Sequence, residues 1–331
     1  MESKLLDLNL DKSCYILVGK YLGDYLHSEG SAASVECTIS HRAGRTTSSI
    51  VETRAIIDDS RVNTVGGLVA GLDIWELAII PFLLNNCQTW LNISGKSIQK
   101  LEDLQNNMYR TLLNVPKTCP TPSLCWDMGG TQIKFRIIAK KLEFLWHLLH
   151  LEDGALAKDI LTAQKNQRMP GLVQECDEWI ENLNLPNIFK EDITKTQWKN
   201  LIKKKIKEEN EKDLKSKMKN YSKLKNSELM DEEFGMRVYL KNLNVHDARM
   251  IYMKRSSMMQ YVKMNYMNDL KNMKSMWQCD SCQRSIDSMN HVLWCPSYKN
   301  LREEKNLEND KDLAKYLHDV FKIRNNLDID R

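Results

Sequence analysis

The stretch SIQKLEDLQNNMYRTLL, residues 97–113, decides the fold class of this chain. Its apolar side chains recur at every third or fourth position, which places them on one face of an α-helix. Ser97 can cap the first turn through its hydroxyl, and Pro116, which has no backbone N–H, prevents the helix from continuing. The predicted buried face consists of Ile98, Leu101, Leu104, Met108 and Leu112.

The sequence that follows predicts a second helix of the same kind. A proline-rich loop and the Gly129-Gly130 turn precede it, and Thr131 is the expected cap. Its apolar positions again have helical spacing, so we expect it to pack against the first helix. They are Ile133, Ile137, Ile138, Leu142, Leu145 and Leu149.

The sequence upstream of residue 97 is also helical in pattern. Residues 31–91 predict two helices with a break near Gly66-Gly67 and a kink or stop at Pro81. The most apolar window, Leu68 to Asn86, contains acidic residues and a proline, so we interpret it as a buried helix and not as a membrane span. Cys14 to Leu26 is a short apolar run broken by glycines, which is consistent with a strand or hairpin.

Three further helices are predicted towards the C-terminus. They are a short one at residues 172–183, a long charged one at 194–225, and one rich in Met and Tyr at 247–273. The expected fold class is therefore mainly α, with one short N-terminal strand or hairpin.

Length and composition support a globular protein. The chain has 331 residues, of which 42% are hydrophobic and 28% charged, and it contains only 13 Gly and 7 Pro. These values indicate about two domains and exclude disordered and collagen-like classes. The nine cysteines, with no secretory leader apparent at the N-terminus, favour a reducing intracellular location, either nucleus or cytoplasm, over a disulfide framework.

Positive charge is concentrated in one part of the chain. The formal net charge is only +4, but residues 190–225 hold more than twice as many Lys as Asp and Glu. Such a segment can neutralise phosphates, whereas the alternative is a solvated helix face in which Glu and Asp interrupt the Lys run. The candidate nucleic-acid contacts are Lys203, Lys204, Lys205, Lys207, Arg249, Lys254, Arg255 and Lys263.

Aromatic residues lie among the later of these basic positions. Tyr252, Tyr261, Tyr266 and Trp277 could stack on unpaired bases. Their helical spacing with neighbouring methionines favours packing in a core instead.

The sharpest chemical signal is Cys279-x2-Cys282-x8-His291-x3-Cys295. Two thiolates from a tight turn and two ligands four residues apart, expected to share a face of a helical turn, can surround one zinc ion. Four protein ligands leave no position for a water molecule, so we predict a structural zinc site and not a hydrolytic one. The alternative is a set of scattered buried thiols.

The residues around these ligands resemble the C-terminal knuckle of LINE-type (non-LTR) retrotransposon reverse transcriptases. The resembling segments are Cys279–Cys282 with His291–Pro296. Tyr21-Leu22-Gly23 is similar to the segment that ends the palm of that family, and Gly66 to Trp90 resembles its thumb region. Leu101 to Pro116, with the Pro-Thr-Pro turn that follows, is similar to the next helix and turn.

The resemblance, together with a polar, linker-like stretch at residues 164–170 that marks a domain boundary, divides the chain into four parts. The parts are a remnant of the palm end at 1–28, a thumb-like helical domain at 29–165, a basic helical region at 166–275, and the Cys-Cys-His-Cys zinc knuckle with a C-terminal helix at 276–331.

The same family needs a cluster of aspartates upstream of the tyrosine-leucine-glycine segment to hold two Mg²⁺ ions. Only twenty residues precede Tyr21, and Asp58-Asp59 lies downstream of it in a helical pattern, as expected of a solvated face. The chain is thus expected not to be an enzyme, but to be a C-terminal fragment that binds RNA or DNA through its basic region and zinc knuckle. The alternatives are a zinc-stabilised protein-interaction protein or a non-functional relic.

Overall fold

The computed structural model describes residues 32–58, 65–221, 224, 233–259 and 278–329. Over these residues the chain is mainly helical and contains no strand, with one isolated antiparallel bridge between Gln278 and Ile286. The mainly α fold class is therefore confirmed. The strand or hairpin expected at residues 14–26 lies outside the described residues.

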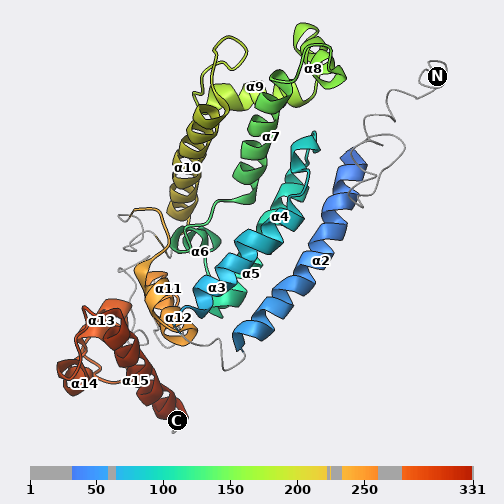
Figure 1. Cartoon of the computed structure of the whole chain (residues 1–331). Coiled ribbons are helices and arrows are strands. Elements are labelled where there is room, and N and C mark those ends of the chain that lie inside the picture. The colour runs from blue at the N-terminus through green and yellow to red at the C-terminus, as the bar shows by residue number, and fades with distance from the viewer. Residues whose placement is uncertain (1–31, 59–64, 222–223, 225–232, 260–277, 330–331) are drawn as a thin grey trace. The chain divides into compact units, whose positions relative to one another are not determined.

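The helices follow one another along the chain as Figure 1 shows. The first group is α2 (Ala32–Asp58), α3 (Gly67–Ile74), the π-helical turn η2 (Trp75–Ile79), α4 (Ile80–Leu83), the 3₁₀ turn η3 (Cys87–Thr89), α5 (Gly95–Leu113), α6 (Thr121–Asp127), α7 (Ile133–Leu149), α8 (Leu156–Asn166) and α9 (Leu172–Asn182). The second group is α10 (Lys195–Lys219), α11 (Val238–Asn242), α12 (Val245–Arg255), α13 (Met289–Trp294), the 3₁₀ turn η8 (Pro296–Tyr298), α14 (Lys299–Glu303) and α15 (Asp310–Ile329).

The chain forms two compact units, each assembled from three separate segments. Unit 1 lies within Met1–Val51, Glu76–Gln105 and Thr131–Asn210, and unit 2 within Glu52–Trp75, Asn106–Gly130 and Glu211–Arg331. The unit boundaries fall inside α2, α5 and α10. The division into four consecutive parts expected from the sequence stays a prediction.

Helix α5 matches the decisive stretch, but its cap is a different residue from the one expected. The helix begins at Gly95, and the Ser97 backbone N–H donates to the Ser94 hydroxyl at 3.2 Å. Ser94 therefore caps the first turn, and Ser97 is a buried residue inside it. Asn114 takes a left-handed conformation with φ 53° directly after the helix, so the helix ends before Pro116.

The N-cap of helix α7 is Gln132, one residue after the expected cap Thr131, and its side chain makes no capping hydrogen bond. Residues distant in the sequence take over this role. The Gln132 N–H donates to Asn210 Oδ1 at 3.0 Å, and the Lys134 N–H donates to Glu102 Oε1 at 2.9 Å. The first amides of α7, which have no partner within the helix, are thus satisfied by tertiary contacts.

Pro81 is placed where its missing N–H does least damage. It stands at the start of α4, directly after the π-helical turn η2. Proline removes the bond to the carbonyl four residues earlier and its ring displaces that carbonyl, and a wider π-helical turn accommodates both effects. The expected irregularity is therefore present as a π-helical turn within a continuous helical segment.

The core of unit 1 is built by α7, α8, α9 and the first half of α10. Trp198 is fully buried and its indole N–H donates to the Leu142 carbonyl oxygen at 2.9 Å. Residues on both sides of the boundary expected at 165/166 contribute to this core, including Leu145, Leu161, Leu172 and Ile202. An ion pair between the buried Lys141 and the half-buried Glu175 joins α7 to α9 beside this core.

The core of unit 2 is organised by the carboxylate of Asp127, which is 1% exposed. Arg237 Nε donates to it at 3.2 Å, and Arg255 donates to both of its oxygens at 3.0 and 3.2 Å. Tyr239 adds a hydroxyl bond at 2.8 Å, and burial together with this carboxylate raises the pKa of Tyr239 well above its ordinary value. One carboxylate at the end of α6 thereby binds α11 and α12.

Gly129 is required by the turn that follows α6. Its φ is +65°, and an added Cβ would lie 2.5 Å from the Met236 backbone nitrogen. We predict that Gly129→Ala lowers the free energy of unfolding by about 2 kcal/mol or more, because it combines left-handed strain with a backbone clash. Urea unfolding measures the effect, and Gly44→Ala, at a helical glycine with open space around it, is the matched control. Equal stability of the Gly129 variant and the natural chain would contradict this packing.

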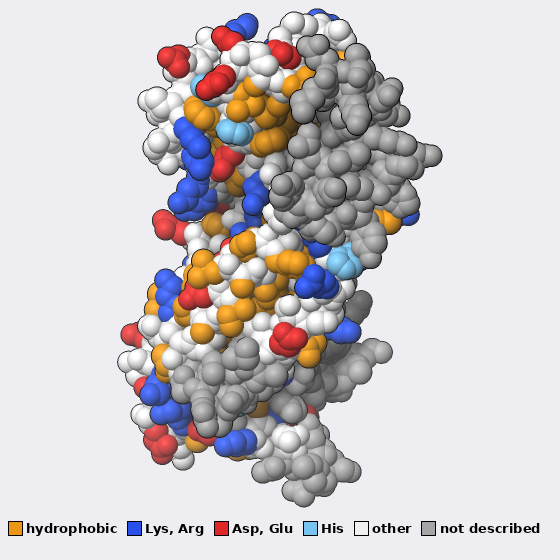
Figure 2. Space-filling model, turned by 45° about the vertical axis from the view of Figure 1, so that its right-hand side comes forward, with side chains coloured by type: hydrophobic (Ala, Val, Ile, Leu, Met, Phe, Trp, Pro, Cys, Tyr) orange, Lys and Arg blue, Asp and Glu red, His pale blue; other side chains and the backbone are white. Residues whose placement is uncertain are grey.

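The surface mixes side chains of all kinds. The face drawn in Figure 2 carries Lys and Arg interspersed with Asp and Glu, and hydrophobic side chains gather between them. No helix in the described part of the chain is long and apolar enough to span a membrane.

Candidate metal centre and basic surface

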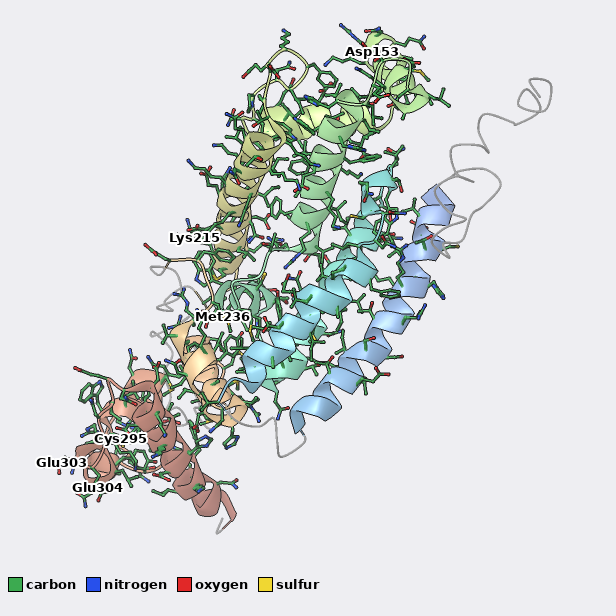
Figure 3. All side chains as sticks on the ribbon, viewed as in Figure 1. Asp153, Lys215, Met236, Cys295, Glu303 and Glu304 are labelled. Carbon is green, nitrogen blue, oxygen red and sulfur yellow. The ribbon has the colours of Figure 1, made fainter. Side chains whose placement is uncertain are left out.

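The structure brings the four expected metal ligands together. The ligand atoms of Cys279, Cys282, His291 and Cys295 all lie within 4.8 Å of one another. Cys279 Sγ is 4.0 Å from Cys295 Sγ, and Cys282 Sγ is 3.2 Å from His291 Nε2. Figure 3 shows Cys295 in this part of the chain, with Glu303 and Glu304 at the neighbouring α14. The four side chains can hold one metal ion.

The first two ligands are positioned by a short hairpin-like loop. The Gln278–Ile286 bridge closes it, and the Cys279 N–H donates to the Ser285 carbonyl oxygen at 2.9 Å. The Arg284 N–H points at Cys282 Sγ across 3.5 Å. A backbone N–H directed at sulfur favours the thiolate, which is the form that binds metal.

The other two ligands come from α13 and its end. Ser288 caps this helix by accepting a hydrogen bond from the His291 N–H at 3.2 Å. The helix ends at Trp294, and Cys295 has extended backbone angles, φ −57° and ψ 128°. The two ligands therefore do not share a helical face as expected: His291 lies on the helix and Cys295 lies just beyond it.

A buried arginine from α15 supports the cluster, and the sequence did not reveal it. The Arg324 guanidinium donates to both oxygens of Asp287, at 2.8 and 3.0 Å, and lies 3.6 Å from Cys279 Sγ. Its Nε also donates to the Tyr298 hydroxyl at 3.1 Å. Hydrogen-bonded partners behind the ligands fix the ligand orientation and raise metal affinity.

Three of these ligands, Cys282, His291 and Cys295, differ in how readily they ionise. Burial raises the pKa of Cys295 to about 11. At Cys282 burial acts in the same direction, but hydrogen bonds from Arg284 and the neighbouring thiols outweigh it, and its pKa lies below the ordinary value. Burial also lowers the pKa of His291, which favours the neutral imidazole that coordinates metals.

The remaining described cysteines form no disulfide and lie outside the four-residue cluster. Cys87 and Cys176 are buried, and burial raises the pKa of each to about 12. They stay protonated at neutral pH and are inert packing residues. The alternative of scattered buried thiols applies to them and not to the four-residue cluster.

The candidate basic residues on α10 are only partly available. Lys203, Lys204 and Lys207 are exposed. Lys205 is half-buried and pairs with Glu208 at 3.1 Å. The exposed three thus form a small positive surface on unit 1, while acidic residues partner the lysines around them.

The later candidates have different environments. Arg249 and Lys254 are half-buried on α12. Arg255 is bound to Asp127 in the core of unit 2, so it acts there as a structural ion pair. Lys263 lies outside the described residues. Arg249 and Lys254 belong to unit 2, whereas the α10 lysines named above belong to unit 1.

Of the four aromatic residues that could stack on bases, the structure describes only Tyr252, which packs in the core. Tyr252 is fully buried and its hydroxyl is 2.8 Å from that of Ser123. Tyr261, Tyr266 and Trp277 lie outside the described residues. Trp294 is 69% exposed on α13, and the Arg302 guanidinium lies 5.5 Å from its ring centre.

Comparison with protein-family models, with curated proteins and with solved structures finds no match for this chain.

Proposed function

We propose that this chain is a C-terminal fragment of a retrotransposon-derived RNA-directed DNA polymerase, and that it binds RNA or DNA without catalysing a reaction. The observation that supports this most is the closed set of one histidine and three cysteines. It occupies the position at which the resemblance to LINE-type reverse transcriptases places a zinc knuckle. The chain holds the nucleic acid by charge and shape, and sequence-specific reading is not required.

The metal in this proposal is zinc. Tetrahedral zinc with Zn–S bonds of about 2.3 Å and Zn–N bonds of about 2.0–2.1 Å separates two sulfurs by about 3.8 Å and a sulfur from a nitrogen by about 3.6 Å. The distances of 4.0 Å between Cys279 Sγ and Cys295 Sγ and 3.2 Å between Cys282 Sγ and His291 Nε2 are near these values. With four protein ligands, zinc supplies folding energy and no reactive water.

The exposed lysines of α10 are the proposed phosphate contacts. Lys203, Lys204 and Lys207 lie within one and a half turns of the helix and are all exposed. Each phosphate they neutralise releases counterions, so the affinity falls as salt rises. Contacts of this type do not depend on the base sequence.

A triple variant, Lys203→Gln, Lys204→Gln and Lys207→Gln, tests this assignment. We expect the slope of log affinity against log salt to decrease in magnitude by about 2 to 3, because each lost phosphate contact removes about 0.7 on single strands and 0.9 on duplexes. Fluorescence anisotropy with a structured RNA, a single-stranded DNA and a duplex DNA measures the slopes. A control with the same charge change replaces the exposed lysines Lys96, Lys117 and Lys311 with Gln.

The two variants separate a located contact from a general charge effect. Equal slopes for both triple variants would contradict the α10 assignment. Absence of binding to all three nucleic acids by the natural chain would contradict the proposed function itself.

A zinc-stabilised protein-interaction role is the second candidate, and exposed apolar side chains favour it. Trp294 beside the metal cluster is 69% exposed, and Leu77 on η2 is 78% exposed. A partner protein that covers such residues binds through apolar burial, which depends weakly on salt. Salt-insensitive binding would therefore favour this candidate over the first.

A further inference from the structure

Helices α12 and α15 pack against each other within unit 2 and enclose a cleft of about 270 Å³ between their exposed edges. The two helices lie side by side in Figure 1. Pockets for small ligands begin at about this volume, and one this small fits one compact ligand group.

Each helix contributes one imidazole and one cation to the cleft. On α12 these are His246 and Arg249, and on α15 they are His318 and Lys322. The spacings of three and four residues place both members of each pair on one face of their helix. The two imidazole rings stack across the helix contact, with ring centres 4.1 Å apart and 15° between the ring planes.

His318 faces the Asp247 carboxylate in this position. Its Nε2 is buried, and Asp247 Oδ1 lies 3.4 Å away. The other oxygen of Asp247 accepts a hydrogen bond from the Asn244 amide at 2.9 Å. Burial lowers the pKa of His318, and the nearby His246 adds to this, so the imidazole is neutral at pH 7. The cleft is also lined by two side chains that carry a permanent positive charge, Arg249 and Lys322.

Apart from Asn325, the rest of the cleft is apolar. Met250, Met253 and Phe321 line it together with Met259. Methionine sulfur is polarisable and packs well against flat aromatic rings, and a phenylalanine ring does the same. A ligand that matches the cleft has a negative group for the two cations and a flat ring for this surface.

We propose that the α12–α15 cleft binds one nucleoside phosphate, with the phosphate between Arg249 and Lys322 and the base against the Met and Phe side chains. The ligand class rests on the proposed function, because a single-stranded nucleic acid presents this group at every position. A free mononucleotide presents the same chemistry. A metal ion does not fit, because among the described residues only the Cys279–Cys295 cluster brings three or more ligands together.

Nuclear magnetic resonance of the imidazole signals tests the proposal on the zinc-loaded chain. The ligands titrated are uridine 5′-monophosphate and adenosine 5′-monophosphate. Uridine, inorganic phosphate and a five-nucleotide single-stranded RNA are titrated for comparison. We expect both monophosphates to shift the His246 and His318 signals, and uridine and phosphate alone to bind at least tenfold more weakly. Equal binding of phosphate alone and of the monophosphates would overturn the assignment of the base.

Two variants locate the site. Arg249→Gln and Lys322→Gln should each weaken binding of uridine monophosphate by about ten- to a hundredfold, as expected for loss of a charge-assisted hydrogen bond. Lys322 is exposed, so its variant is expected to fold even where the Arg249 variant does not. Lys315→Gln, at another exposed lysine of α15, is the control and should leave the affinity unchanged. Unchanged affinity in the Lys322 variant would overturn the proposal.

Two outcomes of this experiment distinguish failure of the cleft proposal from failure of the proposed function. Salt-dependent RNA binding without any histidine shift from the monophosphates or the short RNA overturns the cleft and leaves the proposed function standing. Histidine shifts from the monophosphates without RNA binding support the cleft as a site for free nucleotides and overturn the proposed function.

Discussion

A Cys279→Ser variant should bind no stoichiometric zinc and should lose the ordered packing of α13 and the loop before it. Cys279 is fully buried and its sulfur is approached by both Cys295 and Arg324. Structural zinc contributes about 10–16 kcal/mol in small zinc-dependent units, so the loss of one ligand removes most of the folding energy of this segment. Elemental analysis gives the zinc content, and hydrogen exchange gives the protection of the α13 amides.

A matched variant separates this effect from the general loss of a thiol. Cys37 is exposed on α2, and Cys37→Ser should keep one zinc per chain and full protection of α13. Amides of α7 in unit 1 should stay protected in both variants. One zinc per chain and unchanged α13 protection in the Cys279 variant would contradict the metal centre.

Asp127→Asn should destabilise the chain by about 3–5 kcal/mol, the cost typical of breaking a buried ion pair by removing one partner. Asn keeps the shape of the side chain but removes the Asp127 charge that pairs with the Arg237 and Arg255 guanidinium groups, whose side chains are 17% and 11% exposed. It also weakens the bond from the Tyr239 hydroxyl. The midpoint of urea unfolding, followed by tryptophan fluorescence, measures the change.

Asp153→Asn provides the control for this substitution. Asp153 is 97% exposed and pairs with Lys158 at 2.6 Å. Solvent screens such a pair, so its loss should leave the unfolding midpoint unchanged. If Asp127→Asn behaved like Asp153→Asn, Asp127 would not organise the core of unit 2.

Much of the helical fold follows from local patterns, and the differences lie where tertiary contacts act. The spacing of apolar residues in 97–113 predicts α5 almost to its ends. The sequence pattern predicts a Thr131 cap at the start of α7, whereas Asn210 and Glu102 satisfy its amides in the structure. No local sequence pattern predicts capping by a side chain of another helix, because the packing of the helices decides which side chain reaches these amides.

The metal ligands could be predicted because their spacing is itself the signal. The role of Arg324 beside the metal ligands is not predicted by their spacing. The sequence nevertheless indicates that this side chain is buried, because it follows Leu317, Val320 and Phe321 on the apolar face of α15. A charged residue on an apolar helical face requires a partner. Which partner it has, here Asp287, depends on how the helix packs.

For the basic residues, in contrast, the sequence does not show which side chains are available to a ligand. A count of charges groups Arg255 with Arg249 and Lys254 on α12, yet Arg255 is bound to Asp127 in the core. Asp127 is 128 residues away from Arg255 in the sequence, so only the folded chain reveals the pairing. Charge along a sequence therefore indicates where cations are, and not which of them are available to a phosphate.

The central claim is that this chain binds nucleic acid and that zinc stabilises it. The most direct test measures the affinity of the natural chain for structured RNA between about 50 and 200 mM salt, with and without zinc. The proposed function predicts that log affinity falls linearly with log salt, with a slope of about −2 or steeper, and that removal of zinc weakens binding at every salt concentration. No binding at the lowest salt, or an affinity that is the same at both ends of the range, would contradict it.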